Sequence, residues 1–299
     1  MHLKSFFVIR IEVFFVVNSY LVHLCCLAAV DGQRAKRVRE GKRIMATWPI
    51  EISMESFNEA WTLEGETFWR SVFEMHKHKM EIKNPKIAIG NLEKIFSATF
   101  TLANTKGFQA MSLRDLSRET GISMGGLYAY IGSKNDLASV IEGVLRDTID
   151  EIIGGLSSYD LEPLQCLRAI VYGEIFAMEK LSPWYYFCFM ELKGLPREQQ
   201  QKTLELELRF EGILLDAIHC GVASGKFVCD QPELLASQVT AQLQQWHLKQ
   251  WKFKLREIGK QEYAQFVFES LLKCLQYPAD GIEGGNETAA PSSEDGQSD

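Results

Sequence analysis

The spacing of apolar residues is the feature that most constrains this chain. From Pro85 to about Gln276 they recur with a helical period, and no alternating apolar and polar run of useful length predicts a strand. Four prolines stand near the starts of such segments, where a helix tolerates them: Pro163, Pro183, Pro196 and Pro232. The sequence therefore predicts an all-α protein. Its helices beyond Gly155 are expected at about 162–180, 183–193, 196–224, 232–255 and 260–276.

Short helices with recognisable ends are expected within residues 85–150. The apolar positions of a first helix end at Gly107, where a glycine commonly closes a helix. Ser112 and Asp115 then have the spacing of a capping box, which predicts the start of a second helix. Gly121 ends that helix after about two turns.

A third and a fourth helix follow. Ser123 is placed to cap a third helix that runs to about Tyr130, and Ser133, three residues before Asp136, is placed to cap a long fourth one. Two short helices joined by a glycine-bearing turn and braced by a longer one form a helix-turn-helix unit.

The same segment carries several short motifs at fixed spacing. They are GF at 107–108, SLRDLSRETGIS at 112–123, LY at 127–128 and GSKNDL at 132–137. In these residues the chain resembles the DNA-binding domain of TetR/AcrR-type transcriptional regulators. The resemblance implies an all-α protein with a helix-turn-helix from Ser112 to Ile131, which dimerises and binds a palindromic operator. The competing interpretation is a three-helix unit packed for stability alone.

Two adjacent glycines in the third helix, Gly125 and Gly126, call for an explanation, because each interior glycine costs about 1 kcal/mol relative to alanine. The resemblance supplies one. A recognition helix enters the major groove through its N-terminal turn, and glycines there let the backbone approach DNA closely.

The resemblance also implies the contacts to DNA. Serine hydroxyls and N–H groups at helix starts suit phosphate oxygens, tyrosine hydroxyls suit the DNA backbone, Lys134 adds charge, and Arg114 is a candidate for a base or phosphate. The family usually has lysine at the position of Met124 and threonine at that of Gly126, so the operator sequence stays open. The expected DNA-binding residues are Ser112, Arg114, Ser123, Met124, Gly125, Gly126, Tyr128, Tyr130 and Lys134.

The segment SPWYYFCFMELKGLP at 182–196 concentrates aromatic residues in one short helix. These rings form either part of the core or part of the wall of an effector cavity. By resemblance the C-terminal domain senses a small molecule, and the aromatic content points to a hydrophobic one, such as a fatty-acyl, aromatic or drug-like compound. The expected effector-binding residues are Arg168, Tyr172, Glu174, Phe176, Trp184 and Phe187.

Apolar stripes mark the last two long helices. In the family the last two helices pair with their copies in a homodimer, and packing within one chain is the competing explanation. The stripes are Leu234, Leu235, Val239, Leu243 and Trp246, and then Tyr263, Val267, Leu271 and Leu275.

Charge and catalytic patterns narrow the function. Residues 83–147 hold 8 basic and 6 acidic side chains and 148–299 hold 13 and 23, which permits a DNA-facing module ahead of an acidic one. The sequence has no GxSxG, no phosphate-cradling loop and no metal-type spacing, so we expect no enzymatic activity, cofactor or metal. The seven cysteines are interpreted as reduced thiols of a cytoplasmic protein. An all-helical enzyme is the alternative from another class, because its catalytic residues can be scattered.

The N-terminal 44 residues are an apolar stretch followed by a basic cluster. A signal peptide fits poorly, because Arg10 and Glu12 interrupt the apolar residues. Two interpretations stay open. In one, residues 1–30 anchor a membrane-tethered regulator. In the other, translation starts at a later methionine (Met45, Met75 or Met80).

The sequence thus predicts a ligand-responsive transcriptional regulator, a repressor that binds a palindromic operator as a homodimer and is released by a small hydrophobic effector. A helix is also expected from Met54 to His78. The expected organisation is an extension at 1–44, a helical extension at 45–84, the DNA-binding domain at 85–150, the effector-binding and dimerisation domain at 151–277, and a disordered tail at 278–299.

Overall fold

A computed structural model describes residues 47–82, 84–156 and 158–278. Every regular element in these ranges is a helix, as the sequence predicts. The chain divides into two compact units, Met1–Trp61 and Thr62–Asp299. The N-terminal extension and all of the tail beyond Pro278 lie outside the described residues. Within the described ranges, no helix has the length and apolar character needed to cross a bilayer.

The first unit contributes one short helix, α2 (Met54–Ala60). Ser53 caps it: the Ser53 hydroxyl oxygen accepts from the Ser56 N–H at 3.0 Å, and the Ser56 hydroxyl oxygen accepts from the Ser53 N–H at 3.1 Å. The single helix expected from Met54 to His78 is not formed. Trp61 has extended backbone angles, so the chain leaves the helix there, and Gly65 has a φ of 71°.

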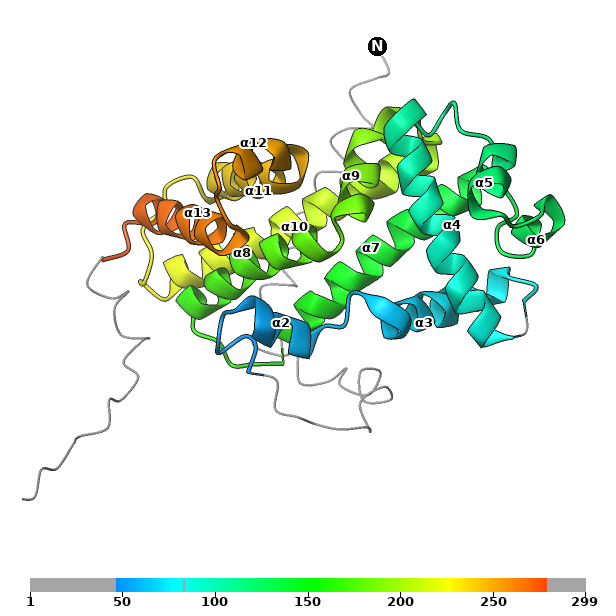
Figure 1. Cartoon of the computed structure of the whole chain (residues 1–299). Coiled ribbons are helices and arrows are strands. Elements are labelled where there is room, and N and C mark those ends of the chain that lie inside the picture. Colours follow the sequence, from blue (N-terminus) through cyan, green and yellow to red (C-terminus); the bar gives the residue numbers. More distant parts are fainter. Residues whose placement is uncertain (1–46, 83, 157, 279–299) are drawn as a thin grey trace, which may run out of the picture. The chain divides into compact units, whose positions relative to one another are not determined.

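The second unit begins with α3 (Gly65–His76) and a 3-10 turn, η2 (Lys77–Lys79). It continues through the helices expected for the DNA-binding domain (Figure 1). These are α4 (Pro85–Lys106), α5 (Leu113–Thr120), α6 (Met124–Tyr128) and α7 (Lys134–Leu156). Their predicted ends are confirmed within two residues. Gly107 and Gly121 both adopt positive φ angles, 83° and 70°, that favour glycine.

Six further helices and a 3-10 turn complete the described part of the unit. They are α8 (Pro163–Lys180), α9 (Ser182–Met190), η3 (Leu192–Gly194), α10 (Arg197–Ala223), α11 (Pro232–Leu248), α12 (Gln250–Leu255) and α13 (Lys260–Cys274). Helix α8 packs against α10, α11 and α13. The helix expected at 232–255 is broken at Lys249, and the break allows Phe253 to stack on Trp246 with ring centroids 5.3 Å apart.

An aromatic cluster joins α3, α4 and α9. We use this name for Phe68, Trp69, Phe96, Phe100, Trp184 and Phe187. Trp184 lies at its centre, stacked on Phe96 at 5.2 Å and edge-on to Phe100 at 5.1 Å. The cluster fixes the aromatic helix α9 against the first helix of the DNA-binding domain. Helix α7 runs without a break from Lys134 to Leu156 and therefore crosses residue 150. The domain boundary expected at residue 150 stays a prediction.

The apolar stripes of α11 and α13 are buried within the chain itself. Eight of their nine side chains are at most 9% exposed, from Tyr263 at 9% to Leu275 at 0%. The exception is Leu234, which is 66% exposed. Packing within one chain therefore explains the eight buried side chains, and a dimer contact through these helices would use Leu234 or residues outside the stripes.

Candidate nucleic-acid interface

The start of α5 is fixed by the predicted capping box. The Ser112 hydroxyl oxygen accepts from the Asp115 N–H at 3.2 Å, and the Asp115 carboxylate accepts from the Ser112 N–H at 2.9 Å. Lys106 and Arg118 pair with the same carboxylate at 2.7 and 2.8 Å. Lys106, followed by Ser112, lowers the pKa of Asp115 far below its usual range. The N–H of Ser112, a candidate phosphate donor, is thus already bonded to an ionised carboxylate.

The turn between α5 and α6 is held by side chains of α5. The Ser117 hydroxyl donates to the Ile122 carbonyl oxygen at 2.6 Å, and the Thr120 hydroxyl oxygen accepts from the Ile122 N–H at 3.2 Å. Gly121 supplies the left-handed residue between them. These local bonds set the direction in which α6 leaves α5.

The two glycines of α6 turn out to have different roles. Ser123 caps the helix by accepting from the Gly126 N–H at 3.1 Å. A Cβ atom added at Gly126 would lie 2.9 Å from Cγ2 of Ile122 and 3.3 Å from the Ser123 hydroxyl, so packing within the chain disfavours a side chain there. A Cβ atom at Gly125 would meet nothing within 4 Å. Gly125 is exposed, and the fold gives no reason for its missing side chain.

Exposed groups accompany Gly125 on this part of the surface. Tyr128, three residues on and therefore on the same side of α6, is 52% exposed. Ser123 and Arg114 are also exposed, and Met124 is half-buried. In the described part of the chain no ion pair holds the Arg114 guanidinium. Ser123 and Tyr128 thus leave hydroxyl groups on α6 near Gly125, and Arg114 leaves an exposed guanidinium in the first turn of α5.

Tyr130 is not among these exposed groups. It is 4% exposed, and its hydroxyl oxygen accepts a 2.8 Å hydrogen bond from Nδ2 of Asn91 on α4. The expectation that its hydroxyl faces DNA is therefore corrected: the side chain anchors the end of α6 to α4.

Lys134 is likewise engaged within the chain. Its ammonium donates to the carbonyl oxygens of Phe108, Gln109 and Met111 at 3.1, 2.9 and 3.2 Å, and it lies 5.1 Å from the Phe108 ring centroid. An ammonium has three protons, so these bonds use all of its donors. The expectation of a phosphate contact is corrected to that of a clamp on the loop between α4 and α5.

We expect Lys134→Met to lower the free energy of unfolding by about 1.5–3 kcal/mol, because three carbonyl oxygens lose a charged donor. Urea unfolding followed by circular dichroism measures this change. Lys94→Met, an exposed change on α4, is the control and should stay within about 0.5 kcal/mol of the parent. Unchanged stability with weakened DNA binding would instead favour the phosphate contact.

One contact has no signal in the sequence. The Glu81 N–H, in the segment before α4, donates to the Ala129 carbonyl oxygen at the end of α6 at 2.9 Å. A main-chain bond between residues 48 positions apart depends on the tertiary path, which no local pattern specifies.

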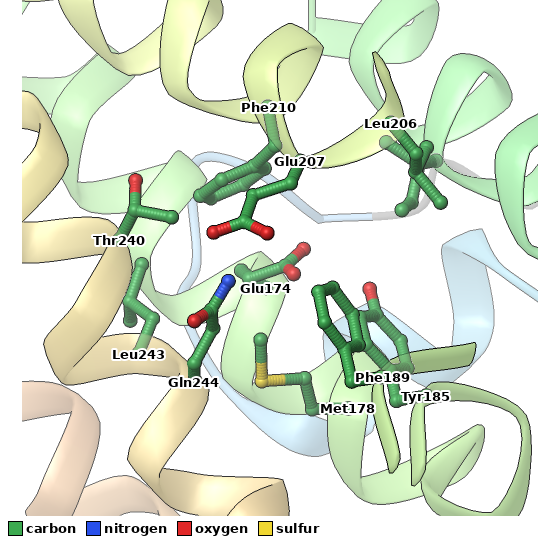
Figure 2. A pocket seen from close by; sticks show the side chains of 11 residues that line it. Glu174, Met178, Tyr185, Phe189, Leu206, Glu207, Phe210, Thr240, Leu243 and Gln244 are labelled. Atoms are coloured by element: carbon green, nitrogen blue, oxygen red, sulfur yellow. The ribbon is translucent and has the colours of Figure 1, made fainter. Parts of the chain in front are cut away.

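Two small cavities, of about 20 Å³ each, lie among α7, α8, α10 and neighbouring helices. Of the six expected effector residues only Glu174 lines them; Figure 2 shows it in the first cavity. Tyr172 contacts Phe268 of α13 and lies under Arg168, and Phe176 packs on Tyr172. Trp184 and Phe187 belong to the aromatic cluster. The helical period of the sequence predicts which residues share one face of a helix. It does not show which neighbouring helix that face contacts.

The first cavity is lined instead by residues that the sequence did not single out together. They are Ile149, Met178, Tyr185, Phe189, Leu206, Glu207, Phe210, Thr240, Leu243 and Gln244, with Glu174. Of the ten others, three are also candidates for the effector cavity from the sequence: Tyr185 and Phe189 of the aromatic segment at 182–196, and Met178. The residues come from five helices, so no segment of the sequence carries the site.

Comparisons with known proteins agree with this fold and helix-turn-helix. The family model "Bacterial regulatory proteins, tetR family" matches residues 95–141. The HTH-type transcriptional regulator HbdR of Aromatoleum sp. (strain CIB) is 22% identical over 198 residues, which are 66% of this chain and 85% of that protein. A tetR-family regulatory protein from Rhodococcus RHA1 has a TM-score of 0.54 at 16% identity, over 62% of this chain and 96% of that one. FadR of Bacillus subtilis, solved with stearoyl-CoA, has a TM-score of 0.50 at 16% identity, over 61% and 98%.

A helix-turn-helix joined to a larger helical body defines the class as a DNA-binding transcriptional regulator. Within that class, residues 95–141 match the tetR-family model, and the chain is similar to the TetR-family regulators named above.

Proposed function

We propose that the protein is a ligand-responsive repressor that binds a palindromic operator as a homodimer, with the first turn of α6 in the major groove. The observation that carries the proposal is Gly125: it is exposed at the start of α6, and the space beside it is empty of protein. A duplex seated there would explain the missing side chain. Ser123 and Tyr128 would bind phosphates, and Met124 and Arg114 are candidates for base or backbone contacts.

Dimerisation through α11 and α13 is the second part of the proposal. Four large apolar side chains around these helices are strongly exposed: Leu234, Trp251, Leu255 and Phe266, at 66, 66, 79 and 64%. Between Leu234 and Gln245 the exposed residues of α11 are uncharged. Exposed apolar residues beside an uncharged helix face favour protein contact. A two-fold dimer would place two copies of α6 about one DNA turn, roughly 34 Å, apart.

Helix α9 would couple the effector to DNA. Tyr185 and Phe189 line the first cavity, whereas Trp184 and Phe187 belong to the aromatic cluster. At the end of α9, the Glu191 carboxylate accepts from the Phe108 N–H at 2.9 Å. A ligand that displaces α9 would therefore move the loop ahead of α5. Ligand and operator would then weaken each other's binding to the same extent. In keeping with repression, KstR2 of Rhodococcus jostii, 25% identical over 145 residues, is named a transcriptional repressor.

We expect the full chain to shift a palindromic fragment of its home locus and Arg114→Ala to weaken that binding about tenfold or more. Tyr128→Ala should weaken it too, because a phosphate would lose a hydroxyl donor. Fluorescence anisotropy at several salt concentrations measures both effects. Arg114→Ala should also reduce the slope of log K against log salt by about one if the guanidinium contacts phosphate. Tyr159→Ala, a change of a similarly exposed tyrosine beyond α7, is the control. Equal affinities in all four proteins would refute this docking of α6.

A further inference from the structure

The first cavity contains acidic groups and no basic ones. Its walls include Glu174 on α8 and Glu207 on α10, and no lysine, arginine or histidine lines it. Figure 2 shows the two carboxylates and the Gln244 amide pointing toward the same space. The second cavity shares Ile149, Glu174 and Phe210 with the first, and Glu174 is its one polar lining residue. Glu174 is thus common to both cavities.

Glu174 is buried without a cation. It is 8% exposed, and no ion pair within the described ranges includes it. Burial raises the pKa of this carboxyl to about 7, with the nearby Tyr185 hydroxyl acting in the opposite direction. A carboxylate held away from water gains more from a cation than an exposed one does. The cavity therefore favours a positively charged ligand over a negatively charged one.

Another buried polar group lies in the same wall. The Thr240 hydroxyl makes no hydrogen bond in the described structure, although this residue is 4% exposed, whereas the buried Tyr185 hydroxyl lies beside the Glu174 carboxyl. Tyr185, Phe189 and Phe210 add aromatic rings to the lining. Ring faces attract cations, most strongly where water is excluded. Aromatic rings and a buried carboxylate together form a site for an amphipathic cation.

We propose that the effector is an apolar organic cation, a protonated amine or quaternary ammonium ion, whose charge pairs with Glu174 between the rings of Tyr185, Phe189 and Phe210. This inference rests on the proposed function, because it identifies the chemical class that releases the operator. It excludes fatty-acyl anions from this cavity, since two carboxylates would oppose them. The stearoyl-CoA complex of FadR does not decide the matter, because 16% identity establishes similarity of fold alone.

The ligand must open the site as it binds. Each cavity holds about 20 Å³, roughly the room for one water molecule. Ile149 and Phe210 lie in the wall of both, so movement of the Phe210 ring would connect them into a larger space. This opening would occur where α8 contacts α10, beside Tyr185. Because Tyr185 belongs to α9, the opening would also displace α9.

The groups that face Glu174 give the expected pH dependence. Tyr185 on α9 stays neutral because burial raises its pKa well above the usual value. Glu207 faces it from α10, Thr240 and Gln244 from α11, and Ile149 from α7. His247 of α11 touches Tyr185 and Met178, and burial lowers its pKa to about 4, so it is neutral. With Glu174 as the titrating group, cation affinity should rise from about pH 6 to about pH 8 as the carboxyl ionises.

The test compares three probes that differ in charge and share an eight-carbon chain: octyltrimethylammonium, octan-1-ol and octanoate. Calorimetry on the full chain should show the cation binding more tightly than the alcohol, and octanoate not binding. Glu174→Gln should weaken cation binding roughly tenfold or more and remove its rise with pH, while thermal unfolding shows that the variant is folded. Glu205→Gln, an exposed change on α10 two residues from Glu207, is the matched control and should bind like the parent.

The outcomes separate this inference from the proposed function. If octanoate binds as well as the cation, if no probe binds, or if Glu174→Gln keeps the parent's affinity, the cation site is refuted, whether or not the chain binds its operator. If the cation binds through Glu174 but the chain shifts no DNA, the ligand site is supported and the regulator function fails. If the cation also lowers operator affinity in the parent and not in Glu174→Gln, both are supported.

Discussion

Trp184→Ala is expected to lower the free energy of unfolding by about 3–5 kcal/mol. Trp184 is 4% exposed, and its ring lies 5.1–5.8 Å from the rings of Phe68, Trp69, Phe96 and Phe100. Truncation would remove its contacts with α3 and α4 together and leave a cavity that the surrounding rings only partly fill. Urea unfolding followed by circular dichroism gives the difference. A loss this large approaches the whole free energy of unfolding of many domains, so we expect a smaller folded fraction at 37 °C.

The matched control is Tyr159→Ala. Tyr159 is 39% exposed in the segment after α7, and its truncation should change the free energy of unfolding by no more than about 0.5 kcal/mol. Similar losses in the two variants would mean that Trp184 does not lie at the centre of a packed cluster.

Gly125→Asp is expected to reduce operator affinity on the order of 100-fold while leaving the fold intact. The added side chain meets no protein atom near its Cβ, and an acidic residue in the first turn of a helix suits the helix dipole. Against a duplex, the same carboxylate would occupy the space of close approach and repel phosphates. Anisotropy titration measures the affinity, and the melting temperature checks the fold.

Gly154→Asp controls for the added charge. Gly154 is exposed near the far end of α7, and a Cβ atom there also meets nothing within 4 Å. This variant should bind the operator like the parent. Parental affinity in Gly125→Asp would show that the first turn of α6 does not approach DNA.

Local chemistry made most of the helix-turn-helix predictable. Ser112, Ser123 and Ser133 cap helices through bonds that span three residues, and such bonds are written in the sequence as short motifs. The glycines at 107 and 121 adopt backbone angles that few other residues accept. Where structure depends on i to i+3 contacts or on single-residue torsions, the sequence suffices.

The errors arose where distant residues decide the outcome. Tyr130 and Lys134 looked like surface donors, but their partners lie 39 and at least 23 positions earlier in the chain. The effector residues stay a prediction, and of the six only Glu174 lines a cavity, because helical period predicts an apolar face but not the helix that this face contacts. Trp184 packs against Phe96 of the DNA-binding domain, whereas its neighbour Tyr185 lines the first cavity.

The peptide groups of Phe108 have a consequence for how this protein can vary. The Phe108 N–H donates to the Glu191 carboxylate, and the Phe108 carbonyl oxygen accepts from the Lys134 ammonium. Two side chains of opposite charge therefore bind the main chain at one residue. The link between α9 and the loop ahead of α5 therefore depends on an acid at 191 and a base at 134, in addition to the buried Phe108 ring, which packs on Phe187.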